Sequence, residues 1–199
     1  MKSEYNGSLT REQFLFYEIK TVASLLNEGL TREEIAKKIQ DDNLFQYPTE
    51  KNVNSIVSAC FKRIDALSSD ELVYRLVKGS TIEAKQINLY AMMKYNKVVD
   101  DFMKQVIGEK FRTKDLHFSS KDLNLFFFSL QEQNSSVASW SEATIKKIKT
   151  VLKKCLVECG YLASSKVEEL EEITICDSLL EHLEKVNDIN VLAAFNYFK

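Results

Sequence analysis

Few residues in this chain have the types and spacing that catalysis or metal binding requires. The two histidines, His117 and His182, lie far apart and have no matched pattern of Cys or carboxylate residues around them. Cys155 and Cys159 would share one face of a helix and could form half of a metal site or a redox pair. Because no further ligand follows at a suitable spacing, two small apolar core residues are the better interpretation. A Gly-rich phosphate loop and a nucleophilic Ser elbow are also missing. The sequence therefore predicts a non-enzymatic protein without metal or other cofactor.

A more informative pattern occupies residues 48–67. Pro48 and Thr49 are residue types that begin a helix. At about 100° per residue, the apolar side chains of this segment fall on one side of the helix and the polar ones on the other. The apolar side comprises Val53, Ile56, Val57, Cys60, Ile64 and Leu67, and the polar side Lys51, Asn52, Ser55, Ser58 and Lys62. Lysine can contact DNA phosphates, and Asn and Ser can contact phosphates or base edges. Thr49 and the five polar residues are therefore candidate DNA-binding residues, although an ordinary solvated helix face would show the same pattern.

The preceding residues strengthen the first interpretation. Thr31 and Glu34 form the capping-box pattern that opens a short helix over residues 31–40. A short capped helix, a connector with one proline and a longer helix are the parts of a helix-turn-helix unit. The connector, residues 40–47, is longer than the tight turn of the simplest helix-turn-helix proteins.

A second basic helix is expected over residues 141–159, ended by Gly160. It carries Lys146, Lys147, Lys149, Lys153 and Lys154, whereas the tail from residue 165 onward is acidic. Residues 166–176 alternate weakly in polarity, and residues 173–175 are the most convincing strand. A helix, a glycine stop and a hairpin resemble the end of a winged-helix module. Two interpretations stay open: Lys146, Lys147, Lys153 and Lys154 contact DNA, or they form a solvated face balanced by the acidic tail.

The elements that hold these residues are predicted to be mainly helical. Only five glycines and one proline occur among 199 residues, too few turn formers for a β-sandwich or barrel. Helix-start patterns recur at Thr10, Ser68, Ser80 and Ser119, and one long helix is expected over residues 81–110. The expected fold is mostly α: a helical bundle with an N-terminal helix-turn-helix-like unit and a C-terminal winged-helix-like module that contains a small β-hairpin.

Three regions are expected: residues 1–67 as a helix-turn-helix-like DNA-binding region, residues 68–135 as a central helical region and residues 136–199 as a C-terminal winged-helix-like region. No stretch approaches the roughly 18 apolar residues of a membrane span, and the N-terminus lacks the apolar core of a signal peptide. A cytoplasmic protein without a membrane partner is expected. Since the net charge is −2, DNA contact would depend on local basic faces.

Many short motifs also occur in the order and spacing of a known family. They are EIKTVA (18–23), NLFQ (43–46) with Thr49, RIDAL (63–67), LVKGS (76–80), Lys94-Tyr95, Phe102, EKF (109–111), Asp122 with Phe126-Phe127, and GYL (160–162). Over about residues 14–185 the chain resembles the BrxA family of bacteriophage exclusion (BREX) defence systems. The resemblance implies a mostly helical protein with a helix-turn-helix-like N-terminal region that binds double-stranded DNA and serves in phage defence beside larger enzymes.

The expected function is therefore that of a non-enzymatic component of a BREX-type phage-defence system. Double-stranded DNA is the expected partner, with other BREX proteins as further partners and no small-molecule substrate. One alternative is a protein–protein adaptor within a defence complex, with the polar helix faces as protein contacts. Another is a transcriptional regulator, which would normally dimerise to match two half-sites.

Overall fold

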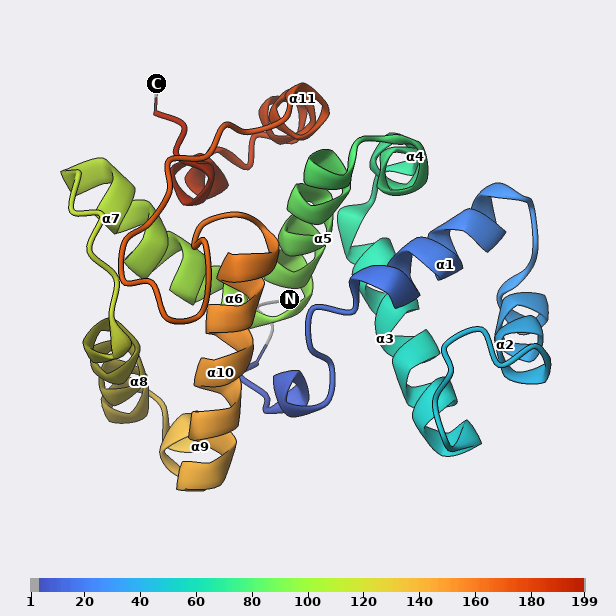
Figure 1. The fold of residues 1–199 in the computed structure, drawn as a ribbon, viewed down its shortest axis with the longest axis horizontal. Helices are drawn as coiled ribbons and strands as arrows, with labels where there is room; N and C mark the ends of the chain where they lie inside the picture. Colours follow the sequence, from blue (N-terminus) through green and yellow to red (C-terminus); the bar gives the residue numbers. More distant parts are fainter. Residues whose placement is uncertain (1–3, 199) are drawn as a thin grey trace. The chain divides into compact units, whose positions relative to one another are not determined.

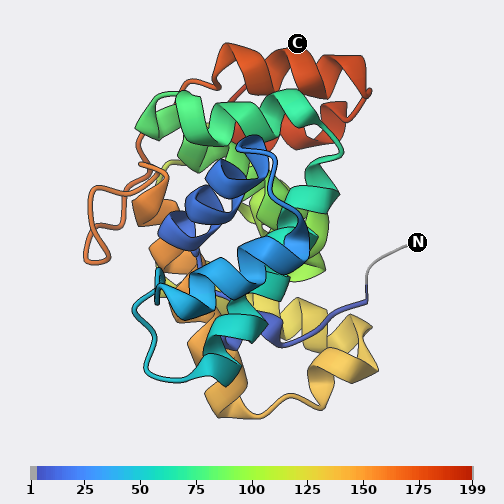
Figure 2. The same ribbon diagram turned by 90° about the vertical axis from the view of Figure 1, so that its right-hand side faces the viewer.

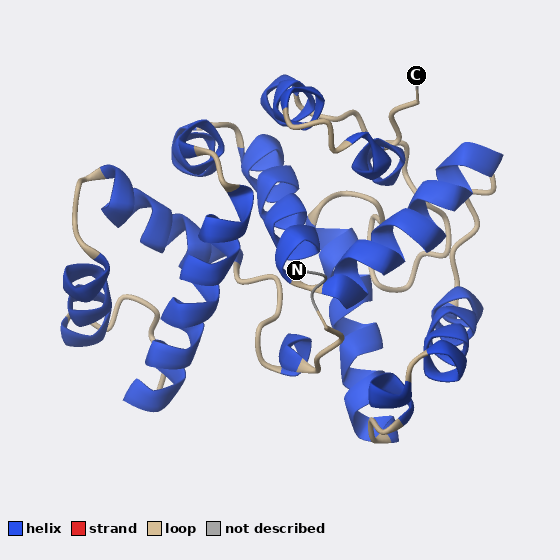
Figure 3. Cartoon of the chain, turned by 180° about the vertical axis from the view of Figure 1, so that it is seen from behind, coloured by secondary structure: helices blue, strands red, loops and turns tan. Residues whose placement is uncertain are grey.

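The computed structural model describes residues 4–198, apart from the side chain of Glu50. Helices dominate it, as Figures 1 and 3 show. The chain forms two compact units. One, here called the continuous unit, is Leu15–Tyr95. The other, the discontinuous unit, joins the segment that ends at Phe14 to the segment that begins at Asn96.

The continuous unit consists of five helices. They are α1 (Phe16–Asn27), α2 (Arg32–Asp41), α3 (Glu50–Leu67), α4 (Asp70–Lys78) and α5 (Thr81–Tyr95). Helix α5 is buried along most of its length and packs on α3 and α4, while α1 packs on α3 and α4. This packing holds α3 by its apolar side, since one face of an amphipathic helix must be removed from water.

The discontinuous unit contains the remaining elements. They are η1 (Ser8–Thr10), α6 (Lys97–Phe102), the π-helical η2 (Met103–Ile107), α7 (Gly108–Thr113), α8 (Ser120–Gln133), α9 (Ser135–Ala138), α10 (Glu142–Glu158), α11 (Asp177–Lys185) and η3 (Ile189–Phe195). Phe102 makes edge-on contacts with Phe118 and Phe126 in its core. These large rings bury much of the apolar area that stabilises the unit.

Most of the expected helix starts are confirmed. Thr31 forms a complete capping box with Glu34, and Ser119 forms one with Asp122. Ser141 caps α10 by accepting a hydrogen bond from the backbone N–H of Thr144. The start expected at Thr10 is wrong: Leu15 takes a left-handed conformation with φ 51°, and α1 begins only at Phe16. The start expected at Ser68 is wrong by one residue, because Ser69 caps α4 and Ser68 is the left-handed C-cap of α3.

The long helix expected over residues 81–110 is interrupted. Asn96 leaves the helical conformation, and its side-chain oxygen accepts the backbone N–H groups of Val98 and Val99 to start α6. Apolar periodicity continues through this position, so the break depends on the local competition between an Asn side chain and the helix backbone. The chain passes from the continuous to the discontinuous unit here.

The β-hairpin expected after α10 is wrong. No strand occurs within residues 4–198, where the only bridge recorded joins His117 to Glu169. The segment after α10 forms the extended loop seen in Figure 2, and its backbone pairs with the residues before α8: Phe118 N–H donates to Glu168 O, and Leu170 N–H to Leu116 O. Residues 173–175 alternate because one side faces the core, but no second strand lies beside them to complete a sheet.

The division into units also differs from the three expected regions. The boundary expected at residue 67 falls at the end of α3, inside the continuous unit. The unit extends past it because α4 and α5 pack on α1 and α3. Residue 135 lies inside the discontinuous unit. No helix in the described part of the chain is both long and apolar enough to cross a bilayer.

Candidate nucleic-acid interface

The polar stripe expected on the helix after Pro48 is exposed on α3. Side chains of Thr49, Lys51, Asn52, Ser55, Ser58 and Lys62 are all accessible to solvent. Lys51, Ser55, Ser58 and Lys62 recur at intervals of four, three and four residues, so they form one stripe along the helix. No ion pair or side-chain hydrogen bond joins these four to another described side chain. The stripe therefore presents two ammonium groups and two hydroxyls to solvent.

The opposite side of α3 is committed to the core, as expected. Val53, Ile56, Val57, Cys60, Ile64 and Leu67 are all buried. This burial fixes the rotation of the helix about its own axis, because turning the stripe inward would bury two lysines and expose six apolar side chains.

The connector before α3 is held against α1 by aromatic residues. Tyr47 donates a 2.6 Å hydrogen bond to the Glu18 carboxylate, and Tyr17 donates one of 3.1 Å to the backbone carbonyl of Leu44. Burial, the hydrogen bond to Glu18 and its charge all raise the pKa of Tyr47 well above the ordinary tyrosine value. Phe45 is buried beside the Tyr47 ring. The NLFQ motif and Tyr47 thus position the first turn of α3.

That first turn has the properties of an anion-binding end. Thr49 is the N-cap residue in an extended conformation, and its side chain makes no capping hydrogen bond. A helix start leaves backbone N–H groups without helical acceptors, and the helix dipole is positive there. Lys51 is the second residue of the helix and lies within its first turn. The arrangement suits a phosphate group.

The candidate lysines of the second helix lie on α10. Lys146, Lys147 and Lys154 are exposed and Lys153 is half-buried. None of the four forms an ion pair with a described carboxylate, and the acidic residues Glu168, Glu169, Glu171 and Glu172 make no recorded ion pair with them. The basic face is therefore not neutralised by direct contact with the acidic tail.

A groove with a volume of about 1020 Å³ lies between α8 and α10. From α10 it is lined by Lys146, Lys149, Lys153 and Lys154, and from α8 by Asn124; Gln131 and Trp140 also line it. Lys147, next to Lys146 in sequence, does not line the groove. We call this feature the α8–α10 groove.

Lys149 connects the two walls of the α8–α10 groove. Its ammonium donates a 2.8 Å hydrogen bond to Asn124 Oδ1 and lies 5.4 Å from the centre of the Phe127 ring. Partial burial lowers the pKa of Lys149. This side chain holds α8 and α10 in register and adds a positive charge to the groove.

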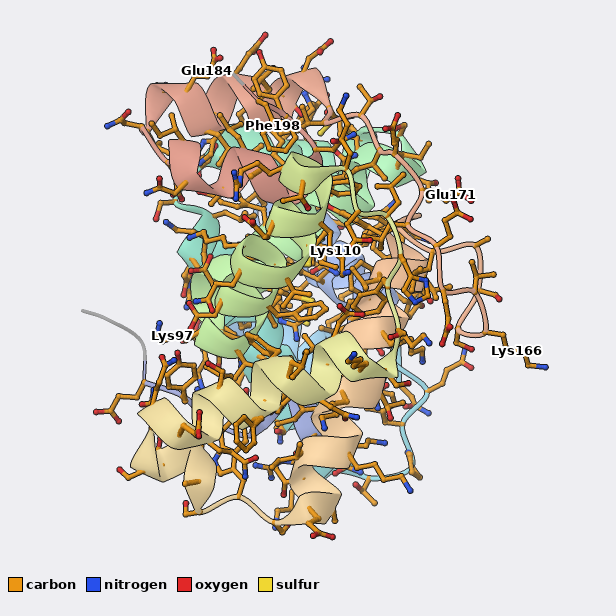
Figure 4. All side chains as sticks on the ribbon, turned by 90° about the vertical axis from the view of Figure 1, so that its left-hand side faces the viewer. Lys97, Lys110, Lys166, Glu171, Glu184 and Phe198 are labelled. Carbon is orange, nitrogen blue, oxygen red and sulfur yellow. The ribbon has the colours of Figure 1, made fainter. Side chains whose placement is uncertain are left out.

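A buried lysine fixes the start of α8. Lys110 pairs with both Asp115 and Asp122 at 3.0 Å and also donates to the backbone carbonyl of His117. Burial opposes the charged form of Lys110, but the two carboxylates raise its pKa overall. Figure 4 shows its side chain inside the unit, in contrast to Lys166, which extends from the loop after α10. Asp122 also completes the cap of α8, so this cluster positions one wall of the groove.

The cysteines and histidines do not come together in a shared site. Cys155 and Cys159 are buried on α10, and His117 is exposed. No group of three or more metal-binding side chains occurs in the portion of the chain that the structure describes.

The sequence alone pointed to the lysines of α10 but missed the groove. Lys149 recurs at helical spacing between Lys146 and Lys153, so periodicity could have placed it on the same face. Asn124, Gln131 and Trp140 come from outside this helix, and no sequence spacing relates them to it.

By fold and site, the molecule is a mostly helical protein of two units, each of which exposes a lysine-bearing helix face. Residues 3–187 match the family model described as BrxA, so the chain belongs to the BrxA family. It is 33% identical over 185 residues to the BREX protein BrxA of Bacillus cereus, covering 92% of each chain. It is 23% identical over 190 residues to the BREX protein BrxA of Escherichia coli, covering 94% of this chain and 88% of the relative. A crystal structure of an uncharacterized protein from Magnetospirillum magneticum has the same fold, with a TM-score of 0.82, 22% identity and coverage of 97% of this chain and 98% of that chain.

Proposed function

We propose that this protein is a double-stranded DNA-binding component of a BREX-type bacteriophage defence system. The defence role rests on the family and on the name that its relatives carry, BREX protein BrxA. The DNA contact rests on one observation above all, the unpaired stripe of Lys51, Ser55, Ser58 and Lys62 on α3. In this proposal α2 and α3 act as a helix-turn-helix-like unit, in which the second helix enters the major groove.

Each group of the α3 stripe has a definite role in this proposal. Lys51 and Lys62 contact phosphates, as does the helix start at Thr49. Asn52 and Ser55 face base edges, whose donors and acceptors differ between base pairs in the major groove. Lys146, Lys147, Lys153 and Lys154 of α10 provide a second contact with DNA. The proposal assigns no chemical reaction to the chain, and nuclease or nucleotide hydrolysis activity that tracks the pure protein would contradict that part.

Titration of a fluorescent DNA duplex with the protein at several salt concentrations tests the proposal. Neutralised phosphates release counterions, so the logarithm of the affinity falls linearly with the logarithm of salt concentration, with a slope of about −0.9 per phosphate contact. We expect measurable binding at low salt and a slope of about −1.8 or steeper, because at least two lysines contact phosphates. Absence of binding at low salt would contradict the proposal.

A protein–protein adaptor is the second candidate, because α8 exposes two large apolar side chains. Leu125 is 58% exposed and Phe128 60% exposed, and they lie three residues apart on one face of the helix. Exposed apolar groups that adjoin one another are typical of protein contacts. If the titration detected no duplex binding, but other BREX proteins bound to this protein, the adaptor function would be favoured.

A further inference from the structure

The α8–α10 groove combines positive charge, amide groups and one aromatic ring. Four lysines line it, against the carboxylates of Glu142 and Glu158. Its apolar floor is almost closed, since Leu123 is 4% and Ile145 8% exposed. The groove also exposes apolar atoms, including those of Val157, Ala163 and Trp140, but it offers no row of large apolar side chains, and helix-in-groove binding needs several such anchor sites. An extended polyanion is the better match for this lining.

Among polyanions, Trp140 favours a nucleic-acid strand with unpaired bases. It is half-buried, lines the groove and is the only tryptophan in the chain. Unpaired bases can stack on an aromatic ring while lysines hold the backbone, whereas the bases of a duplex are already stacked on one another. The amides of Asn124 and Gln131 can bond to base or sugar groups of an exposed strand.

We infer that the α8–α10 groove binds a single strand of nucleic acid, with its phosphates on Lys146, Lys149, Lys153 and Lys154 and a base stacked on Trp140. The inference rests on the nucleic-acid contact proposed for α10, but it names a single strand in place of a duplex as the ligand there, and it does not depend on duplex binding by α3. Lys147 distinguishes duplex binding from single-strand binding at α10. A duplex lying across the outer face of α10 would contact Lys147, whereas a strand inside the groove would not.

The test uses the fluorescence of Trp140 in the full-length protein. The probe is a thymidine oligonucleotide of about 12 nucleotides, within the usual site sizes of single-strand-binding proteins. We expect saturable quenching, because a stacked base lies against the indole ring. An equally long duplex and a polyglutamate peptide serve as competing probes; stronger quenching by either one would overturn the inference and assign the groove to that ligand.

Matched variants locate the binding site. Lys146→Ala/Lys153→Ala removes two charges from the groove, and Lys78→Ala/Lys185→Ala removes two exposed charges outside it. We expect the first variant to bind the oligonucleotide more weakly and to reduce the slope of its salt dependence by about 0.7 per lysine. The second should bind like the wild-type protein. Equal losses in both variants would overturn the inference, since general charge alone would then explain the binding.

The stacking contact is tested with a labelled oligonucleotide, so that the readout does not need tryptophan. Trp140→Ala should weaken binding roughly tenfold, and Trp140→Phe should restore most of it because phenylalanine also stacks. Circular dichroism checks that both variants fold. A folded Trp140→Ala variant with wild-type affinity would overturn the stacking role.

Discussion

Tyr47 illustrates how one side chain positions the proposed DNA-contact helix. Its hydroxyl donates to the Glu18 carboxylate at 2.6 Å, which ties the connector before α3 to α1. A hydrogen bond to a carboxylate contributes more than one to a neutral acceptor, but partial exposure of both residues reduces its value.

We predict that Tyr47→Phe lowers the free energy of unfolding by about 1 kcal/mol. The matched control is Tyr17→Phe, which removes an exposed hydrogen bond to the neutral carbonyl of Leu44 and should cost less. Urea denaturation compares the two variants. A larger loss for Tyr17→Phe would show that the connector is held differently.

Asp122 joins the cap of α8 to the buried Lys110. Burial by itself would raise the pKa of Asp122, but the backbone N–H of Ser119 and the Lys110 ammonium lower it overall. A carboxyl whose pKa is lower in the folded state stabilises the protein above its unfolded pKa, near 3.9, and loses that contribution as the pH falls through the folded pKa.

Stability measured against pH tests this role. Asp122→Asn keeps an oxygen that can accept the Ser119 N–H, but it removes the charge that pairs with Lys110. We expect the variant to be less stable than wild type by roughly 1–2 kcal/mol at pH 7, with the difference shrinking as the pH falls below about 4. A difference that stays constant down to pH 2 would rule out the ionised carboxylate as its source.

At the scale of elements, Gly108 permits the close approach of α7 and η3. A Cβ atom at this position would lie 3.2 Å from the backbone of Ala193 and Ala194, tighter than ordinary contact. Gly108 lies inside the continuous helical run formed by α6, η2 and α7, where glycine is otherwise unfavourable, so the gain must come from packing.

Replacement of Gly108 by Val should therefore destabilise the protein by about 1–3 kcal/mol through overpacking. Gly7→Ala is the matched control, because its Cβ would meet only a side-chain atom of Thr144 at an ordinary 3.6 Å. Thermal unfolding provides the comparison. If Gly108→Val were as stable as Gly7→Ala, the contact between α7 and η3 would have to be looser than described.

The elements differ in how far sequence predicts them. Helices with an apolar stripe, such as α2, α3 and α10, follow from local residue types, and α2 and α10 also have side-chain caps. The exposure of Lys51 and Lys62 follows from the same pattern. The break at Asn96 comes from a local competition between its side chain and the helix backbone, which the apolar periodicity does not reveal, and the left-handed Leu15 follows no local pattern. The expected hairpin failed because alternation indicates burial on one side, but a sheet also needs a neighbouring strand. The groove escaped prediction because its walls come from separate helices.

At the scale of the whole molecule, the N-terminal segment belongs to the unit formed mainly by the C-terminal half. Leu9 is only 1% exposed, and η1 packs on α10. Tyr5 hydrogen-bonds to Asp101, and Asn96 donates to Ser8 Oγ at 3.3 Å. The expected N-terminal region of residues 1–67 thus divides at Phe14.

Substitution of Leu9 by Ala should cost about 2–5 kcal/mol, the usual range for a buried leucine. Hydrogen exchange followed by mass spectrometry locates the loss. We expect faster exchange in α6 and α10 and unchanged exchange in α1 and α3, because Leu9 belongs to the discontinuous unit. Equal acceleration in all four helices would contradict separate stabilisation of the two units.

The α3 stripe is proposed to contact duplex DNA, and this contact decides between the two candidate functions. Its most direct test is the salt dependence of duplex binding for Lys51→Ala/Lys62→Ala, measured beside Lys78→Ala/Lys185→Ala, which removes two exposed lysines elsewhere. If both α3 lysines contact phosphates, the slope should become shallower by roughly one unit for each lysine, and the control should keep the wild-type slope. Circular dichroism establishes that both variants fold. A folded Lys51→Ala/Lys62→Ala protein with unchanged affinity and unchanged slope would contradict the claim and favour the adaptor function.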